Sequence, residues 1–200
     1  MKAKSKLIFV CSVVDNTVKV IKAFSWMAGR PELLAAETQP VPPECDDKKL
    51  AALLAQMFKK LNYEHQPIMV CLARSQATCR YLKIPASDPR EIESMSYLQA
   101  SRYLPYPANE LVTGYDVLST EKDGSSAINL TIVQKSQVER YLKALKELKS
   151  QELSIVLSSY ALAHLYSYLK PQDPATVMLM DMDLNQAELA VFSGQKLLFS

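Results

Sequence analysis

The fold of this chain is decided by one stretch, Asp88 to Leu118, which reads DPREIESMSYLQASRYLPYPANELVTGYDVL. Its first residues carry a signal for the start of a helix. The Asp88 side chain can accept hydrogen bonds from the backbone N–H groups of a first helical turn, which have no partner inside the helix. Pro89 suits the first helical position because it has no N–H to satisfy, and Glu91 can reach back to complete a capping box. A helix is therefore predicted to begin after Asp88.

The body and the end of this helix follow from its apolar residues and its prolines. Ile92, Met95 and Leu98 recur at helical spacing and predict one apolar stripe that faces a core. The two prolines of Leu104–Pro107 lack backbone N–H donors, so the helix is predicted to end before them. The exit from the helix is therefore expected to be a rigid segment.

Strand patterns flank the predicted helix on both sides. Thr78–Ile84 precedes it, and Glu110–Ser119 and Ala127–Gln134 follow it. Residues 120–126 join the last two strands and have the composition of a hairpin loop. The order strand, helix, strand, strand predicts a small module over residues 77–134.

The composition argues against nucleic-acid binding and against a membrane-spanning segment. The 200 residues include 23 Lys and Arg against 21 Asp and Glu, a formal net charge of +2, and the basic residues are dispersed among acidic ones. A nucleic acid is therefore not an expected ligand. The longest uncharged run, Leu153–Leu169, contains several Ser and Tyr residues and is too short to cross a bilayer. No transmembrane segment is expected.

The cysteines show no metal-binding spacing. Cys11, Cys45, Cys71 and Cys79 form no Cys-x-x-Cys pair, and the chain has only two histidines. They are expected to be reduced structural thiols of a cytoplasmic protein. Cys71 and Cys79 are expected on neighbouring strands.

The residues before the module predict a sheet with a helical cover. Leu7–Val14, Val18–Ser25 and Leu33–Gln39 read as three strands of a meander. Asp46 can cap a following helix, and Ile68–Leu72 suits a buried strand. The apolar residues of that helix are Leu50, Leu53, Leu54, Met57, Phe58 and Leu61.

The residues after the module repeat this alternation. Ser136–Lys149 predicts an amphipathic helix, Leu153–Leu157 a strand and Ser159–Leu169 a second helix. The inward residues expected of the first helix are Val138, Tyr141, Leu142, Leu145 and Leu148. A second meander is expected over Val177–Met182, Glu188–Phe192 and Lys196–Phe199.

This order of elements predicts an α/β protein with the layout of the first half of an actin-like, ribonuclease H-like fold. Residues 1–76 and 135–175 are expected to form the first lobe. Residues 77–134 are expected to be an inserted strand-helix-strand-strand subdomain. Residues 176–200 are expected to begin a second lobe that is otherwise largely absent from the sequence.

Four segments resemble the PilM family of type IV pilus assembly proteins, which share an actin-like fold with FtsA and with the cytoplasmic part of GspL. Residues 83–93 resemble the family's entry into its inserted subdomain, and Ser101–Pro107 resembles its helix exit. Val138–Tyr141 resembles the helix that follows, and residues 195–200 resemble the hairpin that opens the second lobe.

The resemblance implies a non-catalytic cytoplasmic scaffold, peripheral at the inner membrane, that binds the short cytoplasmic tail of a PilN-like membrane protein. The residues expected to form part of a groove for this tail are Tyr103, Leu104, Pro105 and Tyr106. The same residues could instead close the core of the small subdomain, and the two roles are compatible. The resemblance leaves homo-oligomerisation open.

Actin-like proteins bind ATP with two hairpin turns of the form Asp-hydrophobic-Gly, whose glycines let the backbone approach phosphate. The family alignment places Ser12-Val13-Val14 at the first turn and Asp181-Met182-Asp183 at the second. Ser12 and Val14 replace the Asp and the Gly, and Asp183 puts a carboxylate where the second glycine belongs, beside the retained Asp181. The chain's four glycines, Gly29, Gly114, Gly124 and Gly194, lie elsewhere.

No ATP, Mg²⁺ or other cofactor is therefore expected, and no ATPase activity. The alternative is a nucleotide-dependent ATPase or sensor in which a second lobe supplies most of the site. A further alternative is a GspL-like component of type II secretion.

Overall fold

The computed structural model describes residues 6–14, 16–25, 31–42, 44–170, 175–183, 186–194 and 196–200. The chain forms two compact units. Unit 1 contains the chain up to Ala73 together with Glu139–Val156, and unit 2 contains Arg74–Val138 together with Leu157–Ser200. Each unit has its own sheet structure and core.

Unit 1 is built on a five-stranded sheet with the order β3-β2-β1-β4-β8. Its strands are β1 (Lys6–Val14), β2 (Thr17–Ser25), β3 (Glu32–Pro40), β4 (Ile68–Leu72) and β8 (Leu153–Leu157). β1, β2 and β3 pair antiparallel as the predicted meander, and β4 adds parallel to β1.

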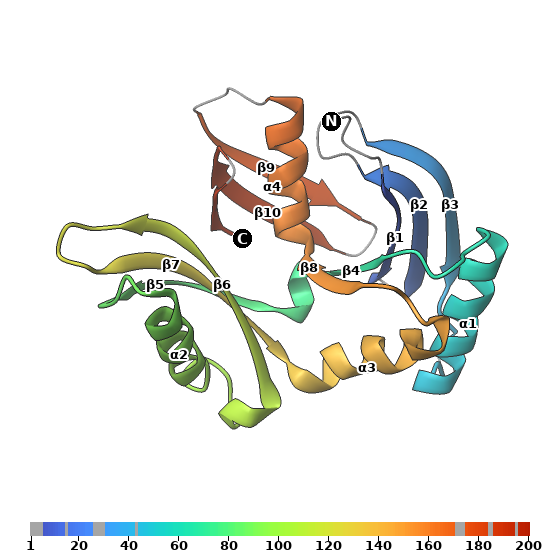
Figure 1. Cartoon of the computed structure of the whole chain (residues 1–200), viewed down its shortest axis with the longest axis horizontal. Coiled ribbons are helices and arrows are strands. Elements are labelled where there is room, and N and C mark those ends of the chain that lie inside the picture. The colour runs from blue at the N-terminus through green and yellow to red at the C-terminus, as the bar shows by residue number, and fades with distance from the viewer. Residues whose placement is uncertain are drawn as a thin grey trace. The chain divides into compact units, whose positions relative to one another are not determined.

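Helix α1 (Asp47–Lys60) covers one face of this sheet (Figure 1). Asp46 caps it as predicted, because its Oδ1 accepts the Lys49 N–H at 2.7 Å. The Phe58 ring stacks on Phe9 of β1 with 5.5 Å between the ring centroids, and Tyr63 meets both rings edge-on. Nearly all of the predicted apolar stripe is buried, and this face is the core of unit 1.

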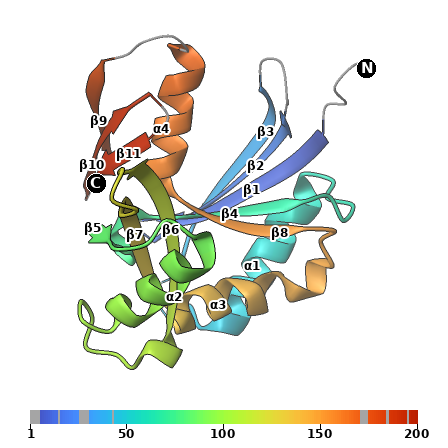
Figure 2. The same cartoon turned by 60° about the vertical axis from the view of Figure 1, so that its left-hand side comes forward.

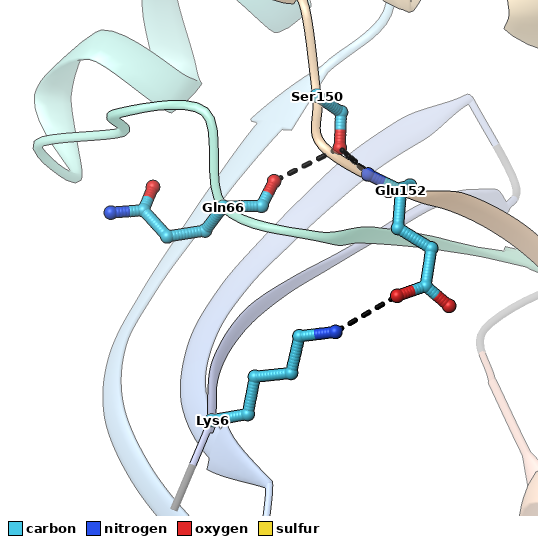
Figure 3. Close-up of polar contacts among 4 residues, drawn as sticks. All are labelled: Lys6, Gln66, Ser150 and Glu152. Atoms are coloured by element: carbon cyan, nitrogen blue, oxygen red, sulfur yellow. Dashed lines mark hydrogen bonds and ion pairs between the residues drawn. The ribbon is translucent and has the colours of Figure 1, made fainter.

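A polar turn joins β8 to the rest of the sheet (Figure 3). The Ser150 Oγ lies 2.9 Å from the Gln66 carbonyl oxygen and also accepts the Glu152 N–H at 3.3 Å. Glu152 in turn accepts a hydrogen bond from the Lys6 Nζ at 2.8 Å, which lowers the pKa of its carboxyl group. These contacts hold the starts of β1, β4 and β8 together, with Lys6 and Glu152 separated by 146 positions in the sequence.

Unit 2 contains the predicted strand-helix-strand-strand module. Its sheet has the order β5-β7-β6, with β5 (Thr78–Ile84), β6 (Leu111–Thr120) and β7 (Ser126–Gln134) all antiparallel. Helix α2 (Pro89–Ala100) lies across one face of this sheet (Figure 1). The core between them contains Ile84, Ile92, Ala100, Leu111, Ile128, Leu130 and Ile132.

The predicted start of α2 at Asp88 is confirmed, but the prediction that Leu98 belongs to its buried stripe is wrong. Asp88 Oδ1 accepts the N–H groups of Arg90 and Glu91 at 2.9 and 3.3 Å. Ile92 is buried and Met95 is half-buried against the core, but Leu98 is exposed. A step of three residues drifts by about 60° around a helix, so two such steps carry Leu98 off the buried face.

The buried side of α2 continues instead through Ser96 and Ala100, at steps of four residues from Ile92. These small side chains fit where a helix lies close to a sheet. The Ser96 hydroxyl oxygen is buried without a hydrogen-bond partner.

Helix α3 (Lys135–Leu145) is shorter than predicted, because a 3₁₀ turn, Lys146–Leu148, follows it and Lys149 adopts a left-handed conformation with φ of 48°. Tyr141 and Leu145 are buried as expected. Leu142 is exposed, and Ala144 takes its place on the buried face. Two further 3₁₀ turns, Arg74–Gln76 and Ala108–Glu110, lie in unit 2.

A second sheet in unit 2 has the order β11-β10-β9, with β9 (Thr176–Met182), β10 (Ala187–Ser193) and β11 (Lys196–Phe199). Helix α4 (Ser158–Leu169) lies against one of its faces (Figure 2). Ala190, Phe192 and Leu197 are fully buried there, and Tyr166 meets the Phe192 ring edge-on at 5.1 Å. The predicted second meander is thus present.

The cysteines are free thiols. Cys71 lies on β4 and Cys79 on β5, and these strands belong to different sheets. The prediction that the two cysteines lie on neighbouring strands is therefore wrong. Burial, with a smaller contribution from Cys71, raises the pKa of Cys11 to about 12. Cys11 is therefore protonated near neutral pH.

We expect alanine at Asp88 to lower the free energy of unfolding of unit 2 by about 1 kcal/mol, because two N–H groups of α2 lose their acceptor. Urea unfolding followed by circular dichroism measures this loss. Ser96→Ala on the same helix is the control: it removes an unpartnered hydroxyl and should leave stability unchanged or raise it. An Asp88→Ala protein as stable as wild type would contradict the capping role.

We expect iodoacetamide at pH 8 to modify Cys45 in the folded protein and to spare Cys11. With a pKa of about 12, roughly one Cys11 thiol in ten thousand is ionised at pH 8, and the side chain is buried. Peptide mass spectrometry before and after unfolding distinguishes the two sites. Rapid modification of Cys11 in the folded state would show that β1 opens readily.

Candidate functional site

The segment that leaves α2 is anchored at its start and exposed at its end. Tyr103 and Leu104 are half-buried and pack against the core between α2 and the β5-β7-β6 sheet. Pro105 and Tyr106 are exposed, with 38% of Tyr106 accessible. Tyr103 and Leu104 therefore contribute to the packing of the core, and Pro105 and Tyr106 lie at the surface.

A contact from β5 fixes the position of this segment. The Arg80 guanidinium lies over the Tyr103 ring, 5.5 Å from its centroid. Such a contact between a cation and an aromatic ring contributes about 0.5 to 1 kcal/mol at exposed sites. The exit segment is therefore held beside β5.

β5 is an edge strand of its sheet. Side chains alternate along it, so Arg80 and Tyr81 point to opposite faces, and Tyr81 is exposed. An edge strand presents backbone N–H and C=O groups that another extended chain can pair with. The sequence pattern did not indicate Arg80 and Tyr81, because their only local sign is a cation and an aromatic residue at adjacent strand positions.

A shallow hollow of about 520 Å³ lies where β5 ends and α2 begins. Pro85, Arg90, Glu91, Ser94 and Met95 line it. The exposed Leu98 lies one turn beyond Ser94 on the same side of α2. This surface combines apolar side chains with charged ones and is suited to a peptide side chain.

The first candidate phosphate turn lies in unit 1. Ser12 and Val14 sit near the end of β1, opposite Lys19 and Thr17 of β2. Neither residue supplies a carboxylate for a metal ion, and Val14 carries a Cβ at the position where the resemblance led us to expect the turn glycine.

The second candidate turn lies in unit 2 and is acidic. Asp181 and Asp183 are both exposed, and the Asp183 N–H donates to the Gln186 carbonyl oxygen at 2.9 Å. Asp181 stands opposite Glu188, whose carboxylate accepts hydrogen bonds from two serine hydroxyls of α4 at 2.5 Å. A cluster of carboxylates repels phosphate.

The described glycines lie outside both turns. Gly114 is within β6, Gly124 lies in the β6–β7 hairpin with φ of 80°, and Gly194 lies between β10 and β11 with φ of 58°. Gly29 lies outside the described residues. Among the described residues, no group of three His, Cys, Asp or Glu side chains is arranged to hold a metal ion. No helix in the described part of the chain is long and apolar enough to span a membrane.

A family model for type IV pilus assembly protein PilM matches residues 40–200. The chain therefore belongs to the PilM family. The structure is similar to a chain of the PilM-PilN type IV pilus biogenesis complex, with a TM-score of 0.78 and 19% identity, over 100% of this chain and 60% of that one. This chain thus spans less than two thirds of the PilM-PilN complex chain that it matches.

Two further solved structures share the fold. One is the cytoplasmic domain of EpsL, an inner membrane component of the Vibrio cholerae type II secretion system, with a TM-score of 0.62 and 13% identity over 96% of this chain and 69% of that chain. The other is a Bacteroides thetaiotaomicron protein with an actin-like ATPase fold, with a TM-score of 0.58 and 13% identity over 98% of this chain and 68% of that one. The predicted actin-like fold is confirmed.

Proposed function

We propose that this chain is a non-catalytic scaffold of a type IV pilus assembly platform at the cytoplasmic side of the inner membrane, and that unit 2 binds the short cytoplasmic tail of a PilN-like membrane protein. The observation that carries this proposal is the anchored exit segment beside the edge of β5. Support also comes from the family and from the likeness to a PilM chain solved in complex with PilN.

The binding mode follows from the chemistry of an edge strand. An extended tail gains backbone hydrogen bonds along β5, and its alternate side chains reach the surfaces on either side of that strand. Tyr106 and Pro105 offer rigid apolar area that loses little conformational freedom when it is covered. No nucleophile, acid or metal ion is required for this role.

The expected affinity is modest. A tail of about ten residues buries less surface than a standard protein interface, so a dissociation constant on the order of micromolar is expected. A partner anchored in the membrane beside the scaffold raises the effective concentration of its tail and compensates for this weakness.

We propose further that the chain does not hydrolyse ATP. The supporting observations are Val14 in place of a turn glycine and the carboxylates of Asp181, Asp183 and Glu188 around the second turn. The fold is also shared with the type II secretion protein EpsL, and the family match favours the pilus role.

The tail-binding proposal is tested by titrating the protein with the N-terminal cytoplasmic peptide of the neighbouring single-pass pilus protein. Tyr106→Ala should weaken binding by about 1 to 3 kcal/mol, because it removes an exposed aromatic anchor. Tyr97→Ala is a matched control, since Tyr97 is 40% exposed on α2 and Tyr106 is 38% exposed.

Two results would count against the proposal. If the wild-type protein does not bind the peptide, this chain does not capture the tail. Equal affinities of wild type, Tyr106→Ala and Tyr97→Ala would mean that the tail binds on another surface.

We expect calorimetry with ATP and Mg²⁺ to show at most weak binding, and phosphate release to stay at the level of buffer. Carboxylates at the second turn oppose phosphate, and the first turn lacks both an acid and a glycine. Asp183→Gly, which restores the family's glycine, is the informative variant. Micromolar Mg²⁺-ATP binding by the wild-type chain would overturn the expectation.

A further inference from the structure

The hollow beside the first turns of α2 continues the free edge of β5. Pro85, which directly follows the last residue of β5, forms one wall of it. The other lining residues come from α2 and are Arg90, Glu91, Ser94 and Met95. One continuous segment, residues 85–95, therefore builds the whole hollow. It begins where the strand along which the partner tail is proposed to lie ends.

The lining of the hollow favours an aromatic side chain. Met95 is half-buried and brings a thioether, which makes favourable contacts with aromatic rings. The exposed Arg90 can place its guanidinium over the face of a ring, and Pro85 adds a flat apolar wall. The Glu91 carboxylate and the Ser94 hydroxyl can accept a hydrogen bond from the N–H of a tryptophan or the O–H of a tyrosine.

The geometry of β5 sets how far this hollow lies from the exit segment of α2. Side chains alternate along a strand, so Arg80, Leu82 and Ile84 point to the same face, and the last two pack on the core under α2. Arg80 lies over Tyr103 of the exit segment, and Ile84 directly precedes Pro85. The two places are therefore four residues apart along β5, which corresponds to about 13 Å in a strand.

We propose that the hollow binds one aromatic side chain, a tryptophan or a tyrosine, of the tail that pairs with β5, four positions away from the tail residue beside Tyr103. This inference rests on the proposed function, because the tail must lie along β5 to reach the hollow. A tail paired with β5 in either direction has the same rise per residue, so tail residues four apart face the same side and match the two places. The hollow thus selects a residue type at one spacing, whereas the backbone hydrogen bonds along β5 accept any sequence.

Methyl NMR of the whole 200-residue protein with isotope-labelled methionine tests the inference. The probe is the N-terminal cytoplasmic peptide of the neighbouring single-pass pilus protein. At saturation it should shift the Met95 methyl signal, assigned by its loss in Met95→Leu, because the ring current of a contacting aromatic side chain changes its chemical shift. The methyl signal of Met57, which is buried in unit 1, should stay in place.

Variants of the peptide test the residue type and the spacing. Leucine in place of the aromatic residue should abolish the shift of the Met95 methyl signal and weaken binding about tenfold. Moving the aromatic residue by one position should have the same effect, because neighbouring residues of an extended chain point to opposite faces.

Variants of the protein test the hollow itself. Ser94→Trp fills it with a ring of the protein's own and should weaken binding of the peptide about tenfold. Ser119→Trp is the matched control, because Ser119 is also an exposed serine and lies on β6, the opposite edge of the same sheet. It should bind as the wild type does. Unfolding curves show whether each variant keeps its fold, and Ser94→Arg replaces Ser94→Trp if the latter does not fold.

The outcomes separate this inference from the proposed function. If the peptide binds and slows amide exchange of β5 but leaves the Met95 methyl signal in place, the tail pairs with β5 and the hollow is not its anchor site. The inference is also overturned if the bound peptide contains no tryptophan or tyrosine, or if Ser94→Trp and the wild type bind it equally. If the wild-type protein does not bind the peptide at all, the proposed function fails and the inference fails with it.

Discussion

Each set of antiparallel strands in this chain depends on one helix that covers one of its faces. An isolated sheet of two or three strands is marginal in water, because it cannot bury enough apolar surface. Here α1 covers the β1–β2 hairpin through Phe9 and Phe58, α2 covers β5-β7-β6, and α4 packs on β11-β10-β9. The caps at Asp46 and Asp88 fix where two of these helices begin.

This single-sided cover leaves edges and outer faces that can contact other molecules. The edge of β5 stands beside a segment that is fixed by its own core residues, which suits the capture of an extended tail.

Local signals were predictable from the sequence, and contacts between distant segments were not. Asp46 and Asp88 act within one helical turn, so their caps could be read directly from residue type and position. Leu98 lies off the buried face because the buried side of α2 continues through the small Ser96, four residues after Ile92. A step of three residues falls about 60° short of a full helical turn, so two such steps carry Leu98 away from the face of Ile92.

At the candidate site, too, local features could be predicted from the sequence and contacts between distant residues could not. The prolines after α2 predicted a rigid exit, but Arg80 lies 23 positions before Tyr103 and nothing local joins them. Cys71 and Cys79 are close in sequence, yet the 3₁₀ turn Arg74–Gln76 separates strands of two different sheets. Which segments become neighbours depends on packing of the whole unit, and a single sequence does not encode it in any one place.

The proposed function requires that an extended partner tail pairs with the edge of β5. Hydrogen–deuterium exchange of the protein with and without the tail peptide of the neighbouring pilus protein tests it most directly. If the tail pairs there, the amides of Thr78–Ile84 gain protection when the tail is bound, together with those around Tyr106. Binding that protects other strands and leaves β5 exchanging at its free rate would contradict it.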